Sequence, residues 1–132
     1  MVQILKNAAV GIVAFVVLDG VWLGLIMKTF YRDALAPIAR MSNGALAPIW
    51  PAAAVVYVLL GAGTALFVVP RATSLASAAL FGAGFGIVVY GVYDLTNFST
   101  LANWPAAVTV ADIAWGAVAS AVAAMAVFTI ER

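Results

Sequence analysis

Three carboxylates that lie within apolar sequence are the residues best suited to do chemistry. Asp19 follows the run GIVAFVVL, Asp94 falls in YDLTNFSTLANWP, and Asp112 falls in ADIAWGA. Trp22 and Trp115 each follow an acid by three positions, a spacing that places both side chains on one face of a helix. An acid beside an aromatic face is suited to holding a cation. Two buried acids that share a proton are suited to hydrolysis.

Polar and aromatic residues extend these acids into stripes at helical spacing, which we interpret as the lining of a pocket. The predicted ligand-binding residues are Asp19, Trp22, Tyr90, Asp94, Asn97, Trp104, Asp112 and Trp115. Two of them have a competing interpretation. An interfacial aromatic belt would also explain Trp104, and hydrogen bonding between helices would also explain Asp94.

The composition indicates that lipid is the solvent of this chain. Of its 132 residues, 67% are hydrophobic and only 8% are charged, against about 25% charged in soluble domains. The net charge of +1 argues against nucleic acid as a partner. The absence of Cys and His excludes disulfides, thiolate or imidazole metal sites and Ser-His catalysis. We expect no cofactor and no metal.

Four apolar segments must position the acids. Each is longer than the ~20 residues that cross a bilayer as a helix, and a helix is required because lipid offers no partner to backbone groups. The sequence therefore predicts an all-α, integral membrane four-helix antiparallel bundle that forms one domain over residues 1–132. The predicted spans are about 4–27, 46–69, 75–95 and 106–130.

An even number of spans places both termini on one side of the membrane. The basic residues are divided three and three between the two sides, so the positive-inside rule gives no preference. The third connection has no basic residue and is the easiest to translocate. We therefore expect a multi-pass protein of the bacterial inner membrane with cytoplasmic termini. The first connection, residues 28–45, is expected to contain a short interfacial helix that ends before Ser42-Asn43-Gly44.

This topology places the first and third connections at one end, with all three acids in the adjoining half of the bundle. A charge at mid-bilayer costs ~2.5–3.5 kcal/mol on insertion scales, so the acids are expected to point inward together. The stretch YDLTNFSTLANWP then forms the rim of the pocket. No basic residue lies beside the acids within a span. We therefore expect Asp19 or Asp112 to be protonated at neutral pH unless a loop arginine or a bound cation pairs with it.

Two pairs of glycines four residues apart predict close packing between helices. They lie in Gly20-V-W-L-Gly24 and in Gly82-A-G-F-Gly86. Small residues at this spacing let membrane helices approach closely, which we prefer to a ligand-binding loop.

The motifs LDGVWLG, YDLTNFSTLANWP and ADIAWGA resemble those of a family of small four-helix bacterial membrane proteins that is a domain of unknown function. The resemblance covers essentially the whole chain, and its YDLTN…W…DxxWG pattern is specific. It implies no reaction, and it implies an association with lipid-modifying enzymes. The positions that match the family pattern are Asp19, Trp22, Asp94, Asn97, Trp104, Asp112, Trp115 and Gly116.

A local resemblance to lipoprotein signal peptidases is also present. Those enzymes carry two catalytic Asp at the end of helix three and in an Asn-x-Ala-Asp motif that opens helix four, and Asp94 and Thr109-V-A-Asp112 fall at similar places. The departures are that Thr109 replaces the Asn, that the Asn-x-x-Asp-Arg motif around Asp94 is missing, and that no large extracytoplasmic segment is present.

Three functions are compatible with the sequence, and whether the protein is an enzyme stays open. The leading hypothesis is a pocket that binds or transports a small cationic, zwitterionic or lipid-headgroup ligand. The second is an intramembrane aspartyl hydrolase that uses Asp94 and Asp112. The third is an accessory subunit whose Gly- and Ala-rich helices pack in a homodimer or a larger membrane complex, with an expected link to lipid modification. Membrane lipid is a partner in every case.

Overall fold

The computed structural model describes residues 1–132 and shows an all-α bundle with four helices long and apolar enough to span a membrane. The first span consists of α1 (Val2–Val21) and the π-helical turn η1 (Trp22–Ile26). The second consists of α3 (Trp50–Gly63), the π-helical turn η2 (Thr64–Val68) and the 3₁₀ turn η3 (Val69–Arg71). The third and fourth are α4 (Leu75–Thr100) and α5 (Ala106–Glu131).

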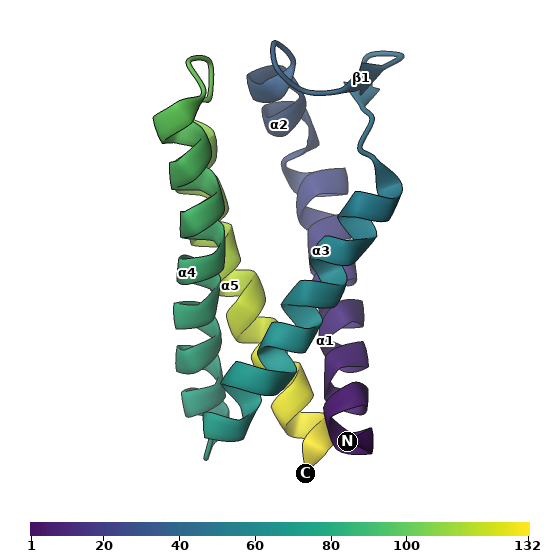
Figure 1. Cartoon of the computed structure of the whole chain (residues 1–132), viewed down its shortest axis with the longest axis vertical. Coiled ribbons are helices and arrows are strands. Elements are labelled where there is room, and N and C mark those ends of the chain that lie inside the picture. The colour runs from purple at the N-terminus through teal and green to yellow at the C-terminus, as the bar shows by residue number, and fades with distance from the viewer.

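The two termini lie at one end of the bundle, and the connections nearest the acids lie at the other (Figure 1). The first connection contains the expected short helix, α2 (Lys28–Leu35), and a small hairpin of β1 (Met41–Ser42) and β2 (Ala45–Leu46). Asn43 and Gly44 form its turn with φ values of 49° and 73°. Positive φ at both central residues is what a tight type I′ hairpin requires.

Two helices have bounds that differ from the predicted spans. Helix α4 continues beyond the predicted end near Leu95 to Thr100, and the second span begins at Trp50 because Ala45 and Leu46 pair in the hairpin. The stretch from Tyr93 to Thr100 is therefore helical, not a loop. The acid of this stretch, Asp94, is turned inward as expected and is fully buried.

Helices α4 and α5 pack side by side along their length. A Cβ atom at Gly86 would overlap the backbone carbonyl of Gly116, and one at Gly82 would overlap the backbone of Ser120. This confirms the packing role predicted for Gly82 and Gly86, and it holds the two helices close enough for their acids to meet.

The same prediction is wrong for Gly20 and Gly24. Nothing lies within 4 Å of a Cβ atom built at either position, and both residues are exposed. Helix α1 instead meets α3 through Gly11, where a Cβ atom would lie 3.1 Å from the Cα of Gly61. The spacing of small residues identified a packing motif but did not indicate which glycines lie at the contact.

The helices separate towards the end that carries the first and third connections. Helix α4 contacts the second span at η2 and η3 but makes no extensive contact with α3 (Figure 1). A core of Phe15, Leu60, Ala119 and Ala123 fills the space between α1, α3 and α5. The bundle is thus closed at the end that carries the termini and divided into two pairs, α1 with α3 and α4 with α5, at the other end.

The contact at Gly86 gives a matched test of this packing. Replacing Gly86 with Ala is expected to destabilise the protein by ~1–3 kcal/mol, because the added methyl group forces α4 and α5 apart. Thermal unfolding in maltoside micelles measures the effect. Gly84→Ala is the control, since a Cβ atom at that position meets nothing within 4 Å. Equal melting temperatures for the two variants would contradict the close contact.

Candidate functional site

Asp19 is held by two donors from two other spans. Its side chain accepts a hydrogen bond of 2.8 Å from the indole Nε1 of Trp115 on α5 and one of 3.0 Å from the hydroxyl of Tyr57 on α3. Asp19 is only 8% exposed. One carboxylate therefore ties α1, α3 and α5 together at the level where the helices separate.

Asp112 is held by a residue from outside the spans. Tyr31 of α2 is buried, and its hydroxyl donates a short hydrogen bond to Asp112. The Tyr31 oxygen in turn accepts a bond of 3.1 Å from the indole Nε1 of Trp22. Burial and the hydrogen bond to Asp112 raise the pKa of Tyr31, so its hydroxyl stays protonated at neutral pH and continues to donate.

Two stacked indoles join the hydrogen-bonded groups around Asp19 and Asp112. The rings of Trp22 and Trp115 lie 4.5 Å apart between centroids and within 2° of parallel. Trp115 bonds to Asp19, and Trp22 bonds to Tyr31. Trp22 begins the π-helical turn η1, a feature that is frequent at functional sites. After this turn the chain enters α2, and Tyr31 is brought back over the end of the bundle.

Asp94 differs from the other acids because it has no donor. It is fully buried, and neither of its carboxyl oxygens has a hydrogen-bond partner. Its carboxyl group lies close enough to that of Asp112 for a bond between them, but both groups are acceptors when ionised. Such a bond forms only when one of the two carries a proton. A buried polar group without a partner is rare and calls for a functional explanation.

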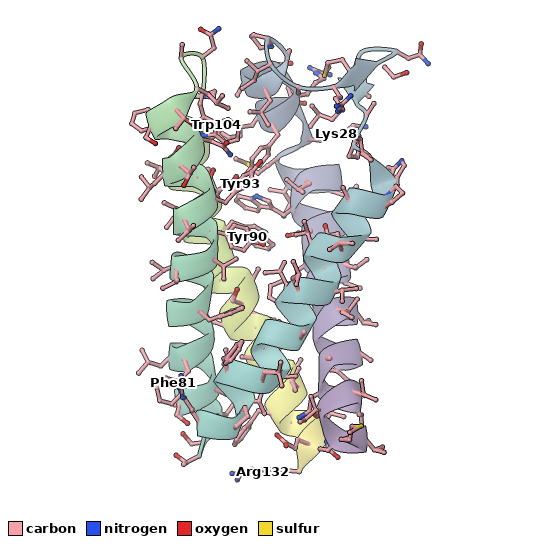
Figure 2. The ribbon with its side chains drawn as sticks, in the orientation of Figure 1. Lys28, Phe81, Tyr90, Tyr93, Trp104 and Arg132 are labelled. Atoms are coloured by element: carbon pink, nitrogen blue, oxygen red, sulfur yellow. The ribbon has the colours of Figure 1, made fainter.

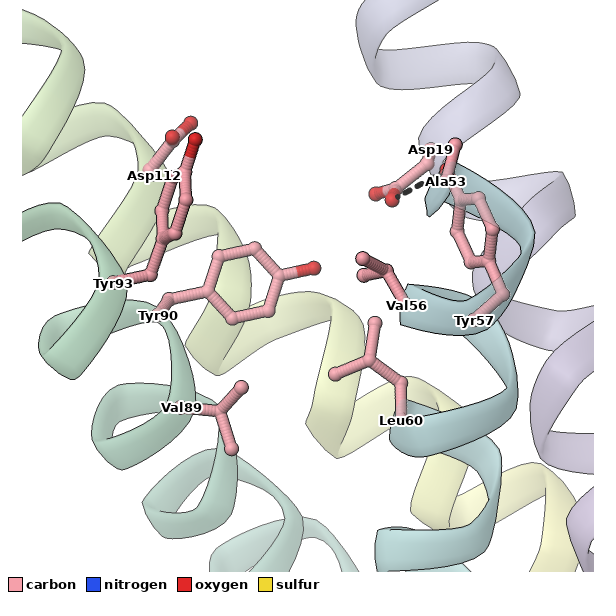
Figure 3. Close-up of a pocket in the computed structure, with 9 residues that line it drawn as sticks. All are labelled: Asp19, Ala53, Val56, Tyr57, Leu60, Val89, Tyr90, Tyr93 and Asp112. Carbon is pink, nitrogen blue, oxygen red and sulfur yellow. Dashed lines mark hydrogen bonds between the residues drawn. The ribbon is translucent and has the colours of Figure 1, made fainter. Parts of the chain in front are cut away.

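A cavity of about 390 Å³ lies between α3 and α4, with acids on opposite walls (Figure 3). Tyr90 projects from α4 towards the second span (Figure 2), with its hydroxyl across the cavity, whereas the ring of Tyr93 lies beside Asp112 (Figure 3). No Lys or Arg lines it. The lining residues are Asp19, Ala53, Val56, Tyr57, Leu60, Val89, Tyr90, Tyr93 and Asp112.

Five of the eight predicted site residues do not line this cavity, and four of these five lie around it. Trp22 and Trp115 orient the acids, and Asp94 lies behind Asp112. Trp104 lies above the cavity, where its indole donates a bond of 3.0 Å to Thr109. Its ring also lies edge-on to Tyr93 at 5.9 Å. Asn97 is half-buried and is not part of the lining.

The prediction omitted the phenols that complete the site. Tyr57 and Tyr93 are aromatic residues in the same half of the bundle. Neither lies three or four positions from an acid on its own helix, which is the spacing that identified the predicted residues. Tyr31 lies outside every span. Tyr57 and Tyr31 each donate to an acid of another element, and spacing along one helix cannot reveal such contacts.

A second cavity of about 790 Å³ lies on the other side of Asp19, between α1, α2, the hairpin and α3. The two cavities share Asp19, Ala53 and Tyr57 as a common wall. Lys28 and Arg32 line the second cavity, but Arg32 is engaged by Asp33 at 2.8 Å. Of the two cavities, only the second is lined by basic side chains.

Tyr31 gives a testable contact between α2 and the spans. Replacing Tyr31 with Phe leaves Asp112 without its donor, and this loss is expected to cost ~1–3 kcal/mol. Helix α2 should then detach more often, so that trypsin cleaves after Lys28 and Arg32 severalfold faster. Thr29→Ala, on the exposed side of α2, is the control and should leave the rate unchanged. Equal cleavage of both variants would show that Tyr31 does not hold α2 in place.

Comparison with known proteins agrees with this architecture. Residues 4–129 match a family described as "Predicted membrane protein (DUF2177)". No curated protein and no solved structure matches the chain significantly. The match covers nearly the whole chain, including all three acids and both stacked indoles. The chain therefore belongs to the DUF2177 family of predicted membrane proteins.

Proposed function

We propose that this membrane protein binds an organic cation, an ammonium group with small substituents, in the cavity between α3 and α4. The observation that carries the proposal is that Asp19 and Asp112 face an apolar cavity that contains no basic side chain. Buried charges are normally paired. A cation that lies between the two acids would supply the missing partner.

The aromatic lining supports a cation over a neutral ligand. Tyr57, Tyr90 and Tyr93 line the same space, and a desolvated cation that lies over an aromatic face gains ~2 kcal/mol. The volume of about 390 Å³ falls in the lower part of the ~300–1,000 Å³ range of small-molecule pockets. Asp94 adds negative charge behind Asp112 without lining the cavity.

Binding is better supported than passage across the membrane. Below the cavity, Phe15, Leu60 and Ala123 form a closed core, and Phe15 has no exposed surface. A ligand could cross only if this core separated. We further propose that the protein lies in the bacterial inner membrane with cytoplasmic termini.

The contact between Asp94 and Asp112 favours an aspartyl hydrolase as the second candidate. An aspartyl dyad works by sharing a proton and activating water between its two acids. Here Asp94 has no exposed atom and lines neither cavity, and Asp112 is already bonded to Tyr31. Asp94 is therefore out of reach of water and substrate from either cavity, so the dyad could not work as a pair and we prefer the binding function.

Titration with tetraethylammonium tests the proposal. The protein is washed free of lipid in maltoside micelles and titrated in a calorimeter at neutral pH. Saturable binding at one site is expected, with no binding of the anion ethanesulfonate. Asp33→Asn is the control, because Asp33 is exposed and paired with Arg32 outside the spans. Absence of saturable cation binding, or equal binding of the anion, would overturn the proposal.

A further inference from the structure

The cavity between α3 and α4 opens towards the side of the bundle. Its walls come mainly from these two helices, which have no extensive contact with each other beside it. Val56 and Tyr93 line the cavity although they are 53% and 59% exposed, so they form the edges of the opening. In a membrane-spanning bundle, the surface at this level faces lipid rather than water.

The residues around the opening are apolar. Leu59 and Val92 lie next to the edges and are 65% and 66% exposed. Neither side of the opening therefore carries a charge that would repel hydrocarbon. A molecule that is already dissolved in the bilayer could enter the cavity without crossing a polar barrier.

The polarity inside the cavity changes along the bundle axis. Asp19, Asp112 and the Tyr90 hydroxyl lie towards the end with the connections, whereas Leu60 and Val89 lie on the side nearer the middle of the bundle (Figure 3). Asp112 is six positions into α5, which begins at Ala106, and this places it roughly 9 Å below the helix start at 1.5 Å per residue. A lipid has the same order, with its headgroup towards the surface and its chains towards the middle.

We propose that the ligand is a membrane lipid with an ammonium headgroup, which enters the cavity sideways from the bilayer between α3 and α4. This inference rests on the proposed cation site and names its natural occupant. The ammonium group lies between Asp19 and Asp112, and the upper part of an acyl chain passes Leu60 and Val56 into the surrounding lipid. A headgroup without a positive charge is disfavoured, because the polar side chains that line the cavity are acids and phenols and none is basic.

Lipid retention measures this directly. The full chain is placed in nanodiscs with equal amounts of phosphatidylethanolamine and phosphatidylglycerol, extracted into maltoside and analysed by native mass spectrometry. At least fivefold enrichment of phosphatidylethanolamine is expected for the wild type. Asp19→Asn should reduce this enrichment to below twofold. Equal retention of the two lipids by the wild type, or enrichment unchanged in Asp19→Asn, would overturn the lipid assignment.

A bulky side chain at the edge of the opening tests the lateral route. Val56→Trp should reduce the retained phosphatidylethanolamine at least fivefold, whereas Leu59→Trp, three positions further along α3 and outside the cavity lining, should leave it unchanged. Retention by Val56→Trp at the wild-type level would overturn the route. Tetraethylammonium binding without lipid enrichment would refute this inference and leave the cation site intact. If the wild type showed neither tetraethylammonium binding nor lipid enrichment, the cation site itself would be refuted.

Discussion

Replacing Asp19 with Asn is expected to weaken tetraethylammonium binding at least tenfold. The amide oxygen can still accept from Trp115 or Tyr57, so the fold is kept while the negative charge is lost. Two opposite unit charges about 4 Å apart attract each other by ~4 kcal/mol at an effective dielectric constant of about 20, and 1.4 kcal/mol corresponds to a tenfold change in affinity. Calorimetric titration of both proteins measures the difference.

The same substitution should change the pH dependence of binding. In the wild type, affinity for the cation should fall as the pH falls, because protonation removes negative charge from the carboxylates that face it. Asp19→Asn lacks one of these titrating groups, so its affinity should vary less with pH. Asp112→Asn should show a smaller loss, since Asp94 still lies behind it. An affinity in Asp19→Asn equal to that of the control Asp33→Asn would contradict the role of Asp19.

Replacing Asp94 with Asn is expected to make the protein more stable by ~1–3 kcal/mol, the cost of leaving a buried polar group unsatisfied. The carboxyl group is buried without a donor and faces another acceptor in Asp112. The Asn side chain has nearly the same volume, and its amide can donate to Asp112. The midpoint of thermal unfolding in maltoside should therefore rise by several degrees.

Cation affinity should fall in the same Asp94→Asn variant, by a smaller factor than in Asp19→Asn, because one of the nearby negative charges is lost. Stability and binding would then move in opposite directions, as is common where a site is kept strained for function. The control is again Asp33→Asn, which should change neither quantity. A lower melting temperature in Asp94→Asn would show instead that Asp94 is structural, as an acid that joins neighbouring helices.

The substitutions also distinguish the remaining functions. A hydrolytic dyad would fail completely when either Asp94 or Asp112 is replaced, and Asp19→Asn would be tolerated. If the Asn variants of Asp19, Asp94 and Asp112 all stayed folded with unchanged cation and lipid binding, the accessory subunit would be the only remaining hypothesis of the three. The binding function requires the graded pattern, with Asp19 the most sensitive and the other two partial.

The amino-acid sequence by itself determined the class of this protein and the inward orientation of its acids. Four apolar segments of spanning length permit only helices, because lipid leaves backbone groups without other partners. The energetic cost of a charge in hydrocarbon requires Asp19, Asp94 and Asp112 to face inward, and the structure buries the first two and places the third at the cavity wall.

Only the tertiary structure decided which groups meet. Tyr57 reaches Asp19 from another helix, and Tyr31 reaches Asp112 from outside the spans. Spacing along one helix specifies a face but not the partner that the face meets, and the close contact at Gly86 is what sets Asp94 against Asp112. The separation of α3 from α4, which creates the cavity, depends on where helices cross. That geometry follows from packing between residues distant in the chain.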